Sequence, residues 1–276
     1  MMQSEQSAFI HVGTSGFSFD DWKGSVYPPH LKKGEWLTYY EKVLGFKTLE
    51  LNFTYYALPS PRALAGLSAK TSEDFLFSVK AFKGLTHDSK GMKSNPSSDY
   101  LARFDRFNES LRPLVDAGKL ICVLAQFPFS FYPLKENLDY LKLFKERMRD
   151  IPLTVEFRNR YWLQPHIFDF LRLHLIGYCV VDEPKLPQLI PFYPAATSPI
   201  AYFRFHGRNT SWFKVPASVR YNYLYSPEEL RSFLSPVKSI AAQSKSLFIF
   251  FNNCHAGSAA QNATMFVHML HEEQLP

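Results

Sequence analysis

The sequence predicts an α/β protein, a single (β/α)8 barrel of the TIM type that spans residues 1–276. Short apolar segments alternate with longer amphipathic segments, a pattern typical of parallel strands connected by helices. Eight of the short segments have the length of strands, and eight strand–helix units in about 250 residues are typical of this barrel. A doubly wound sheet is the competing architecture, but the glycines of HVGTSGFSF are followed by DDW and YPPH rather than by a helix, so no dinucleotide-binding turn is predicted.

Strands are predicted in eight segments because each is a short apolar run. In chain order these segments are AFIHVGTSG, FKTLELNFTYY, FLFSVKAF, LICVLAQFP, LTVEFRN, GYCVVDEP, AYFRFHGR and LFIFFNN. The proline-rich segment after the sixth strand, KLPQLIPFYPAATSP, is predicted to be mostly loop.

Helices are predicted between the strands and after the last one. Glycines end GEWLTYYEKVLG, SDYLARFDRFNESLRPLVDAG and PHIFDFLRLHLIG. A serine N-cap followed by proline begins SPRALAGLSAK and SPEELRSFLSPVKSIAAQ. Apolar residues at helical spacing predict a helix in LKENLDYLKLFKERMRD, and SAAQNATMFVHMLHEE is the last predicted helix.

The composition indicates a globular protein with a large core. Apolar residues make up 46% of the chain and charged residues 20%, so flexibility is expected only in residues 1–7. The net charge of +6 permits an anionic partner without requiring one. The three cysteines lack metal-ligand spacing, no signal peptide is recognisable, and no apolar run approaches the roughly 18 residues of a membrane helix. We therefore predict a cytoplasmic protein without a membrane partner.

Polar residues share one face in most of the predicted strands, opposite an apolar face that suits contact with helices. The polar side chains predicted on the inner faces are Glu50, Asn52, Lys80, Gln126, Glu156, Arg158, Asp182, Arg204, His206, Arg208, Asn252 and Asn253. They lie toward the carboxyl ends of the strands, where such barrels build their active sites, so a polar cavity is predicted there. A lattice of ion pairs that only closes the barrel is the alternative, although buried ion pairs contribute little net stability.

The residue types in this set suit metal-free acid–base chemistry of a hydrolase or lyase type on an anionic ligand. Glu50 and Glu156 are the candidate bases, and Lys80 and His206 are the candidate acids. The predicted ligand-binding residues are Asn52, Gln126, Arg158, Trp162, Asp182, Arg204, Gly207, Arg208, Asn252 and Asn253. The segments HGRN and NNCHAG follow strands seven and eight, where barrels often hold phosphate, so the predicted partner is a small, phosphate-bearing ligand.

Several segments, taken in order, resemble the YecE-like family, a domain of unknown function (number 72). They are VGTSGFSFDDWKGSVYP, LELNFTYYALPS, FSVKAFKGLTH, LAQFPFSF, VEFRNRYW, FRFHGR, and FNN followed by QNA. The resemblance runs from about Phe9 to about Val267 and implies a TIM-type barrel in bacterial or archaeal cytoplasm, without implying a reaction. Phe17 and Phe19 stand where the family pattern has Trp and Tyr, and Phe53 stands where a small residue is common.

Two other functions stay open at this point. Glu156, Asp182 and His206 lie on consecutive predicted strands and can form the divalent-metal site of a nuclease or a sugar isomerase, although arginines flank the same layer. The lysines of KGLTHDSKGMKS and the aromatic residues at strand ends suit non-catalytic binding of nucleic acid. No cofactor is identified from the sequence.

Overall fold

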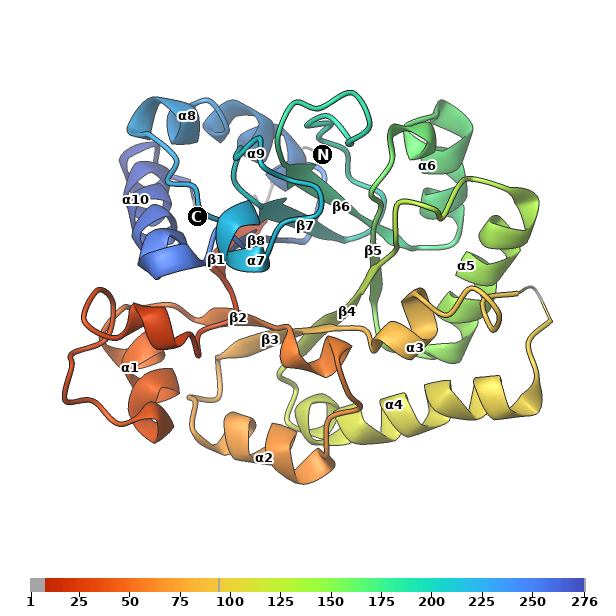
Figure 1. Cartoon of the computed structure of the whole chain (residues 1–276), viewed down its shortest axis with the longest axis horizontal. Helices are drawn as coiled ribbons and strands as arrows, with labels where there is room; N and C mark the ends of the chain where they lie inside the picture. The colour runs from red at the N-terminus through yellow and green to blue at the C-terminus, as the bar shows by residue number, and fades with distance from the viewer. Residues whose placement is uncertain (1–7, 94, 276) are drawn as a thin grey trace, which may run out of the picture.

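The computed structural model describes residues 8–93 and 95–275, in which eight parallel strands close into a barrel (Figure 1). The strands pair in sequence order, and β8 returns to pair with β1. They are β1 (Phe9–Ser15), β2 (Thr48–Leu51), β3 (Leu76–Lys80), β4 (Leu120–Gln126), β5 (Leu153–Glu156), β6 (Gly177–Asp182), β7 (Ile200–Phe205) and β8 (Ser246–Phe251). The predicted barrel is confirmed. The prediction that residues 1–7 are flexible lies outside the described residues.

Helices surround the barrel and connect consecutive strands (Figure 1). They are α1 (Trp36–Lys42), α2 (Pro61–Ala69), α3 (Lys83–Thr86), α4 (Ser98–Asp116), α5 (Lys135–Arg147), α6 (Pro165–Leu173), α7 (Ala217–Arg220), α8 (Pro227–Arg231), α9 (Leu234–Ala241) and α10 (Ser258–Glu272). The helix α10, blue in Figure 1, packs beside β1 and β8, the first and last strands, which pair to close the barrel. None of the helices in the described ranges is long and apolar enough to cross a membrane.

Two features of the helical layer differ from the sequence prediction. The segment predicted as one helix, SPEELRSFLSPVKSIAAQ, breaks into α8 and α9. Pro236 explains the break, because a proline inside a continuous helix lacks an N–H and its ring collides with the carbonyl four residues earlier. The short helices α3 and α7 were not predicted, and they lie in the connections that follow β3 and β7.

The outer faces of the strands form the core between barrel and helices, as the alternation of residues predicts. Leu49, Phe77, Val155 and Phe203 are all completely buried there. Gly13 lets β1 and β2 approach closely, because a Cβ at this position would lie 2.2 Å from the carbonyl oxygen of Thr48. Close packing of this kind fixes the phase of the strands and hence which side chains face inward.

The interior changes character along the barrel axis. Near the amino ends of the strands, the His11 ring stacks on Phe248 with centroids 4.7 Å apart. In the middle, the Tyr202 hydroxyl donates to Glu50 Oε2 at 2.6 Å and contacts Ser78 Oγ at 2.8 Å. Beyond this layer, toward the carboxyl ends, the interior becomes charged.

Candidate functional site

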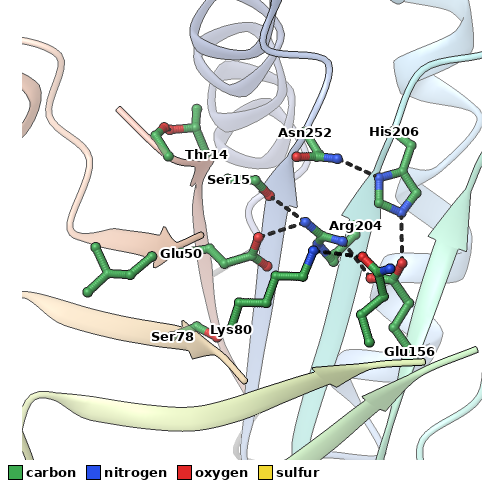
Figure 2. A network of polar contacts seen from close by, with 12 residues as sticks. Thr14, Ser15, Glu50, Ser78, Lys80, Glu156, Arg204, His206 and Asn252 are labelled. Carbon is green, nitrogen blue, oxygen red and sulfur yellow. Dashed lines mark hydrogen bonds and ion pairs between the residues drawn. The ribbon is translucent and has the colours of Figure 1, made fainter. Parts of the chain in front are cut away.

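Arg204 is the centre of a buried charge network at the carboxyl end of the barrel (Figure 2). It follows Tyr202 on the inner face of β7, and its side chain is only 1% exposed. One guanidinium nitrogen donates to Glu50 Oε1 at 2.8 Å, and the other donates to Glu156 Oε2 at 2.6 Å. The two carboxylates come from β2 and β5, so this single arginine ties opposite sides of the barrel together.

Glu156 also meets a second arginine. Arg158 Nη2 lies 2.7 Å from Glu156 Oε1, and Arg158 Nη1 donates to Glu183 Oε2 at 3.0 Å. Burial alone would raise the pKa of Glu156, but Arg158 and Arg204 outweigh it and hold that pKa well below the ordinary range. Glu183 shows the opposite result, because burial raises its pKa to about 7 despite Arg158. Glu156 is therefore a fixed anion, and Glu183 is a group that can exchange a proton near neutral pH.

Lys80 reaches the same space from the end of β3 but makes different contacts (Figure 2). Its Nζ donates to Gln126 Oε1 at 2.7 Å and lies 4.8 Å from the centroid of the Tyr55 ring. No carboxylate in the described ranges forms an ion pair with it. Burial and the neighbouring Arg204 charge lower the pKa of Lys80 to about 7. A substantial fraction of this amine is consequently neutral at physiological pH.

His206 continues the inner face just beyond β7 and is completely buried. The Asn252 amide lies 2.8 Å from His206 Nδ1, and His206 Nε2 lies 3.3 Å from Glu156 Oε1. Burial lowers the pKa of His206 to about 3 and outweighs the attraction of Glu156. The imidazole is therefore neutral near pH 7. An Asn252 amide that donates to Nδ1 leaves the proton on Nε2, facing Glu156.

A cavity of about 670 Å³ opens above this network. Of the predicted site residues, those that line it are Glu50, Asn52, Lys80, Gln126, Arg158, Arg204 and Asn252. Glu156 and His206 lie behind this lining and contact it through Arg204 and Asn252. A cavity therefore lies where the polar mouth is predicted, and its volume is typical of sites for small ligands.

The cavity has a polar floor and an aromatic rim. Phe53, Tyr56, Phe129 and Phe213 line it, and their side chains are between 38% and 70% exposed. Lys214 and Arg220 also line it, and both come from the connection between β7 and α8. Arg220 donates to the Trp212 carbonyl oxygen at 2.9 Å and lies over the Trp212 ring. Ion pairs with carboxylates are absent for both cations within the described residues.

Five predicted ligand-binding residues do not line the cavity: Trp162, Asp182, Gly207, Arg208 and Asn253. For Asp182, the reason is the direction in which the side chains of β6 point. Cys179 and Glu183 contact Glu156 and Arg158 inside the barrel, so Asp182 has the opposite phase and points outward. There Asp182 accepts hydrogen bonds from Arg208 and from the Tyr225 hydroxyl. The predicted phase of β6 was wrong, and Glu183 is the inward-facing acid.

Arg208 departs from the inner face for a local reason. The backbone of Gly207 has a φ of 87°, which turns the chain after β7, so Arg208 does not continue the series of Arg204 and His206. Its guanidinium instead bridges Asp182 and Glu229 of α8. Gly207 and Arg208 therefore connect the barrel to its outer layer of helices. Other cations, further along the connection between β7 and α8, line the cavity instead.

Asn253 and Trp162 are likewise held by the protein itself. Asn253 donates to the Tyr223 carbonyl oxygen at 2.9 Å and to Asn262 Oδ1 at 2.8 Å. Trp162 is 1% exposed, stacks on Phe157 at 3.9 Å and donates to the Phe131 carbonyl oxygen at 2.6 Å. Trp162 therefore does not line the cavity, as a ligand-binding residue there would, because the turn after β5 folds its ring into the core.

The structure does not assemble the metal site that the sequence left open. Asp182 is separated from Glu156 and His206 by the strand itself, and Glu156 is held between two guanidinium groups. Within residues 8–93 and 95–275, no group of three His, Cys, Asp or Glu side chains is placed to hold a metal ion. These residues therefore do not fit a hard divalent cation.

Several functional candidates escaped the sequence analysis. Glu183 adjoins Asp182, so only the alternation of side chains along the strand could indicate which of the two acids faces inward. Lys214, Arg220 and Tyr221 lie in the long connection between β7 and α8, where nothing in the residue pattern indicates which side chains fold over the mouth. Only the high content of aromatic residues in this connection, SWFKVPASVRYNYLY, could have signalled a ligand-facing segment.

The comparisons with known proteins agree with this architecture. The family described as "Protein of unknown function DUF72" matches residues 11–276. The UPF0759 protein YunF of Bacillus subtilis (strain 168) is 34% identical over 273 residues, covering 95% of this chain and 94% of that protein. A crystal structure of a DUF72 family protein from Thermotoga maritima MSB8 is 45% identical with a TM-score of 0.87, covering 95% of this chain and 99% of that one.

More distant structures extend the likeness of the fold. A DUF72 family protein from Enterococcus faecalis V583 is 28% identical with a TM-score of 0.82, covering 95% of this chain and 96% of that one. A xylose isomerase-like TIM barrel protein from Mycobacterium smegmatis, solved in complex with magnesium, is 13% identical with a TM-score of 0.51, covering 98% of this chain and 99% of that one. The latter likeness shows the fold alone. The barrel, the motifs and these matches together show that the chain belongs to the DUF72 family.

Proposed function

We propose that the cavity binds a small, phosphate-bearing anion whose ring system stacks on the aromatic rim, as the base of a nucleotide would. The observation that carries this proposal is the charge of the lining. Among the described residues, five cations and a single carboxylate line the cavity. The cations are Lys80, Arg158, Arg204, Lys214 and Arg220, and the carboxylate is Glu50. Cations that line a concave site attract anions and orient them through charge-assisted hydrogen bonds.

The inner and outer cations have different parts in this proposal. Arg158 and Arg204 are compensated by Glu50, Glu156 and Glu183, so they contribute donors more than net charge. Lys214 and Arg220 at the rim have no such ion pairs in the described structure, so they supply the net positive charge. A phosphate is expected near these two residues.

The aromatic rim supports a ligand with a planar ring. Phe53, Tyr56, Phe129 and Phe213 expose apolar surface around one opening, which is a common property of ligand sites. Stacking of a base on such a ring stabilises a complex by about 1–3 kcal/mol. A nucleotide combines this ring with a phosphate in one small molecule.

Acid–base chemistry on the bound ligand is the finer part of the proposal. Lys80 is the group best suited to transfer a proton at neutral pH, because its pKa lies at about 7. Glu50 shares the cavity floor and serves as its partner. Glu156 and His206 are less suited, since two arginines hold Glu156 ionised and burial holds His206 neutral.

Calorimetric titration with adenosine 5′-monophosphate, adenosine and inorganic phosphate tests the binding proposal. The informative variant is Lys214→Gln/Arg220→Gln, and the matched control is Arg62→Gln/Lys238→Gln, which removes two exposed cations elsewhere on the surface. We expect the nucleotide to bind more tightly than adenosine, and the rim variant to bind it about tenfold more weakly or worse, which is about 1.4 kcal/mol. Equal affinities for wild type and rim variant, or no binding of any of the three compounds, would contradict the proposal.

Binding of single-stranded nucleic acid is the second candidate. Lys83, Lys90 and Lys93 are exposed in the segment after β3 and do not line the cavity, so they suit a longer polyanion that extends beyond it. An eight-residue oligothymidylate distinguishes the two candidates. Tight, salt-sensitive binding that needs these three lysines, without binding of the mononucleotide, would favour nucleic acid as the ligand.

A further inference from the structure

We propose that Lys80 is a nucleophile, and that it forms an imine with the carbonyl carbon of an anionic aldehyde or ketone bound in the cavity. The inference rests on the proposed function only in requiring that the same cavity admits an anion. It goes further in assigning a covalent step, a reacting atom and a class of substrate.

The contacts of Lys80 distinguish it from the structural cations of this protein. Arg204 and Arg158 are each fixed by two carboxylates. Even the half-exposed Lys47 contacts both Glu41 and Asp74. Lys80 Nζ has an amide oxygen as its polar partner, Gln126 Oε1, and an aromatic face beside it. An amide positions the amine without holding it as an ammonium ion, as a carboxylate would.

Lys80 is also accessible from the cavity. Its side chain is partly exposed and lines the wall, whereas Glu156 and His206 lie behind the lining. Figure 2 shows the Lys80 side chain extended into the space that Glu50 and Arg204 also face. A carbonyl group that enters the cavity can therefore approach Nζ without any movement of the barrel.

Burial and the charges of Arg204 and Arg158 favour the reactive, neutral form of the Lys80 amine. They outweigh the opposing charges of Glu156 and Glu50. Burial and Arg204 lower the pKa of Lys80 to about 7, so a substantial fraction of the amine is neutral at pH 7. An ordinary lysine with a pKa near 10.4 is roughly 0.04% neutral at that pH. A lysine beside another cation in a desolvated pocket is a recognised arrangement for imine formation, because only the neutral amine has a lone pair to donate.

The proposed step is balanced without an added oxidant or reductant. The Nζ lone pair forms a bond to the carbonyl carbon while the C=O π electrons move to oxygen. A proton passes from nitrogen to that oxygen, which gives a carbinolamine. A second proton, taken from solvent and relayed by Glu50 on the cavity floor, lets the hydroxyl leave as water while the nitrogen lone pair forms the C=N bond. The protonated imine has the same charge as the lysine ammonium, so the net charge of the site, with Glu50 and Arg204, is the same as when Lys80 is protonated.

Reductive trapping tests the proposal on the full chain. Wild-type protein is mixed with a substoichiometric amount of pyridoxal 5′-phosphate, which combines an aldehyde, a planar ring and a phosphate, and is then reduced with borohydride. Peptide mass spectrometry measures the label at every lysine. We expect Lys80 to carry most of the label, trapping to increase as the pH rises through about 7, and Lys80→Arg to lose this label while Lys238→Gln keeps it.

Two outcomes separate this inference from the proposed function. If adenosine 5′-monophosphate binds in the cavity but the label spreads over exposed lysines and leaves Lys80 unmodified, the nucleophile is refuted and the anion site stands. If Lys80 is labelled selectively and the nucleotide neither binds nor protects it, the nucleophile stands and the nucleotide site is refuted. The wild-type label map decides the first case even if Lys80→Arg does not fold.

Discussion

Replacement of Arg204 with methionine is the perturbation for which the structure predicts the largest effect on the charge network. Methionine keeps much of the volume of the side chain and removes the guanidinium. The carboxylates of Glu50 and Glu156 are both completely buried, and both bind this group. Glu156 keeps Arg158 as a partner at 2.7 Å. Glu50 keeps only the hydroxyl of Tyr202 among the polar contacts of the described residues.

The expected loss follows from this difference between the two carboxylates. Removal of one partner of a buried ion pair costs about 3–5 kcal/mol, because the remaining charge is left without compensation. Most of that cost comes from Glu50, so Arg204→Met/Glu50→Gln, which removes the orphaned charge as well, should recover at least half of the loss. The reason is that replacing both partners of a buried pair is often close to neutral.

Urea unfolding, followed by circular dichroism, measures both effects as free energies of unfolding. Arg112→Met is the matched control, because Arg112 pairs with Asp116 on the exposed side of α4 at 3.0 Å, and such pairs contribute about 0.5 kcal/mol or less. A loss for Arg204→Met below about 1 kcal/mol, or a double variant less stable than the single one, would refute the claim that these charges are buried together and compensate one another.

Two further predictions concern pH and packing. Burial holds the pKa of His206 at about 3, against 6.5 for an ordinary histidine, so between these values the folded protein binds fewer protons than the unfolded chain and stability falls as the pH falls. Wild type should therefore lose about 2 kcal/mol more than His206→Gln between pH 7 and pH 5 in urea unfolding, and parallel losses would contradict this reasoning. Gly13→Ala places a Cβ 2.2 Å from the Thr48 carbonyl oxygen and should lower stability by about 1–3 kcal/mol, whereas Gly66→Ala on the open surface of α2 should not destabilise. Equal melting temperatures for these two variants would show that β1 and β2 are not so closely packed.

The alternation of residues was sufficient to predict the fold and much of the site where a regular strand continues up to the side chain in question. Glu50, Glu156 and Arg204 all lie inside or at the end of such strands, so their phase is fixed by apolar neighbours on the opposite face. The outer faces of these strands carry leucine, valine and phenylalanine that pack against helices. Only one phase buries them, and that phase directs the charges inward.

The prediction failed where the apolar pattern leaves both phases equivalent. In β6 both faces are apolar up to two adjacent acids, so the sequence does not choose between Asp182 and Glu183. The choice depends on Arg158, which follows β5 and pairs with Glu183, and on Arg208, which pairs with Asp182. Such contacts form only when the barrel closes, so the local pattern of residues in β6 does not indicate them.

Backbone turns account for the other differences. Arg208 would continue the inner face if β7 were extended, but the positive φ of Gly207 ends the alternation. Trp162 follows β5 in a short 3₁₀ turn, Arg160–Trp162, that directs its ring into the core. The positions of the rim residues Lys214 and Arg220 depend on the path of a long connection, which is held in part by its own internal contacts, such as the hydrogen bond from Arg220 to the Trp212 carbonyl oxygen.

A crystal structure of the protein grown with adenosine 5′-monophosphate tests the central claim most directly. The account predicts density for the nucleotide inside the cavity above Arg204, with phosphate oxygens within hydrogen-bond distance of Lys214 or Arg220 and the base against one of the four exposed rings of the rim. Density for the nucleotide only outside this cavity, or a cavity that holds nothing but water at saturating nucleotide, would contradict the claim that the mouth of this barrel is an anion site.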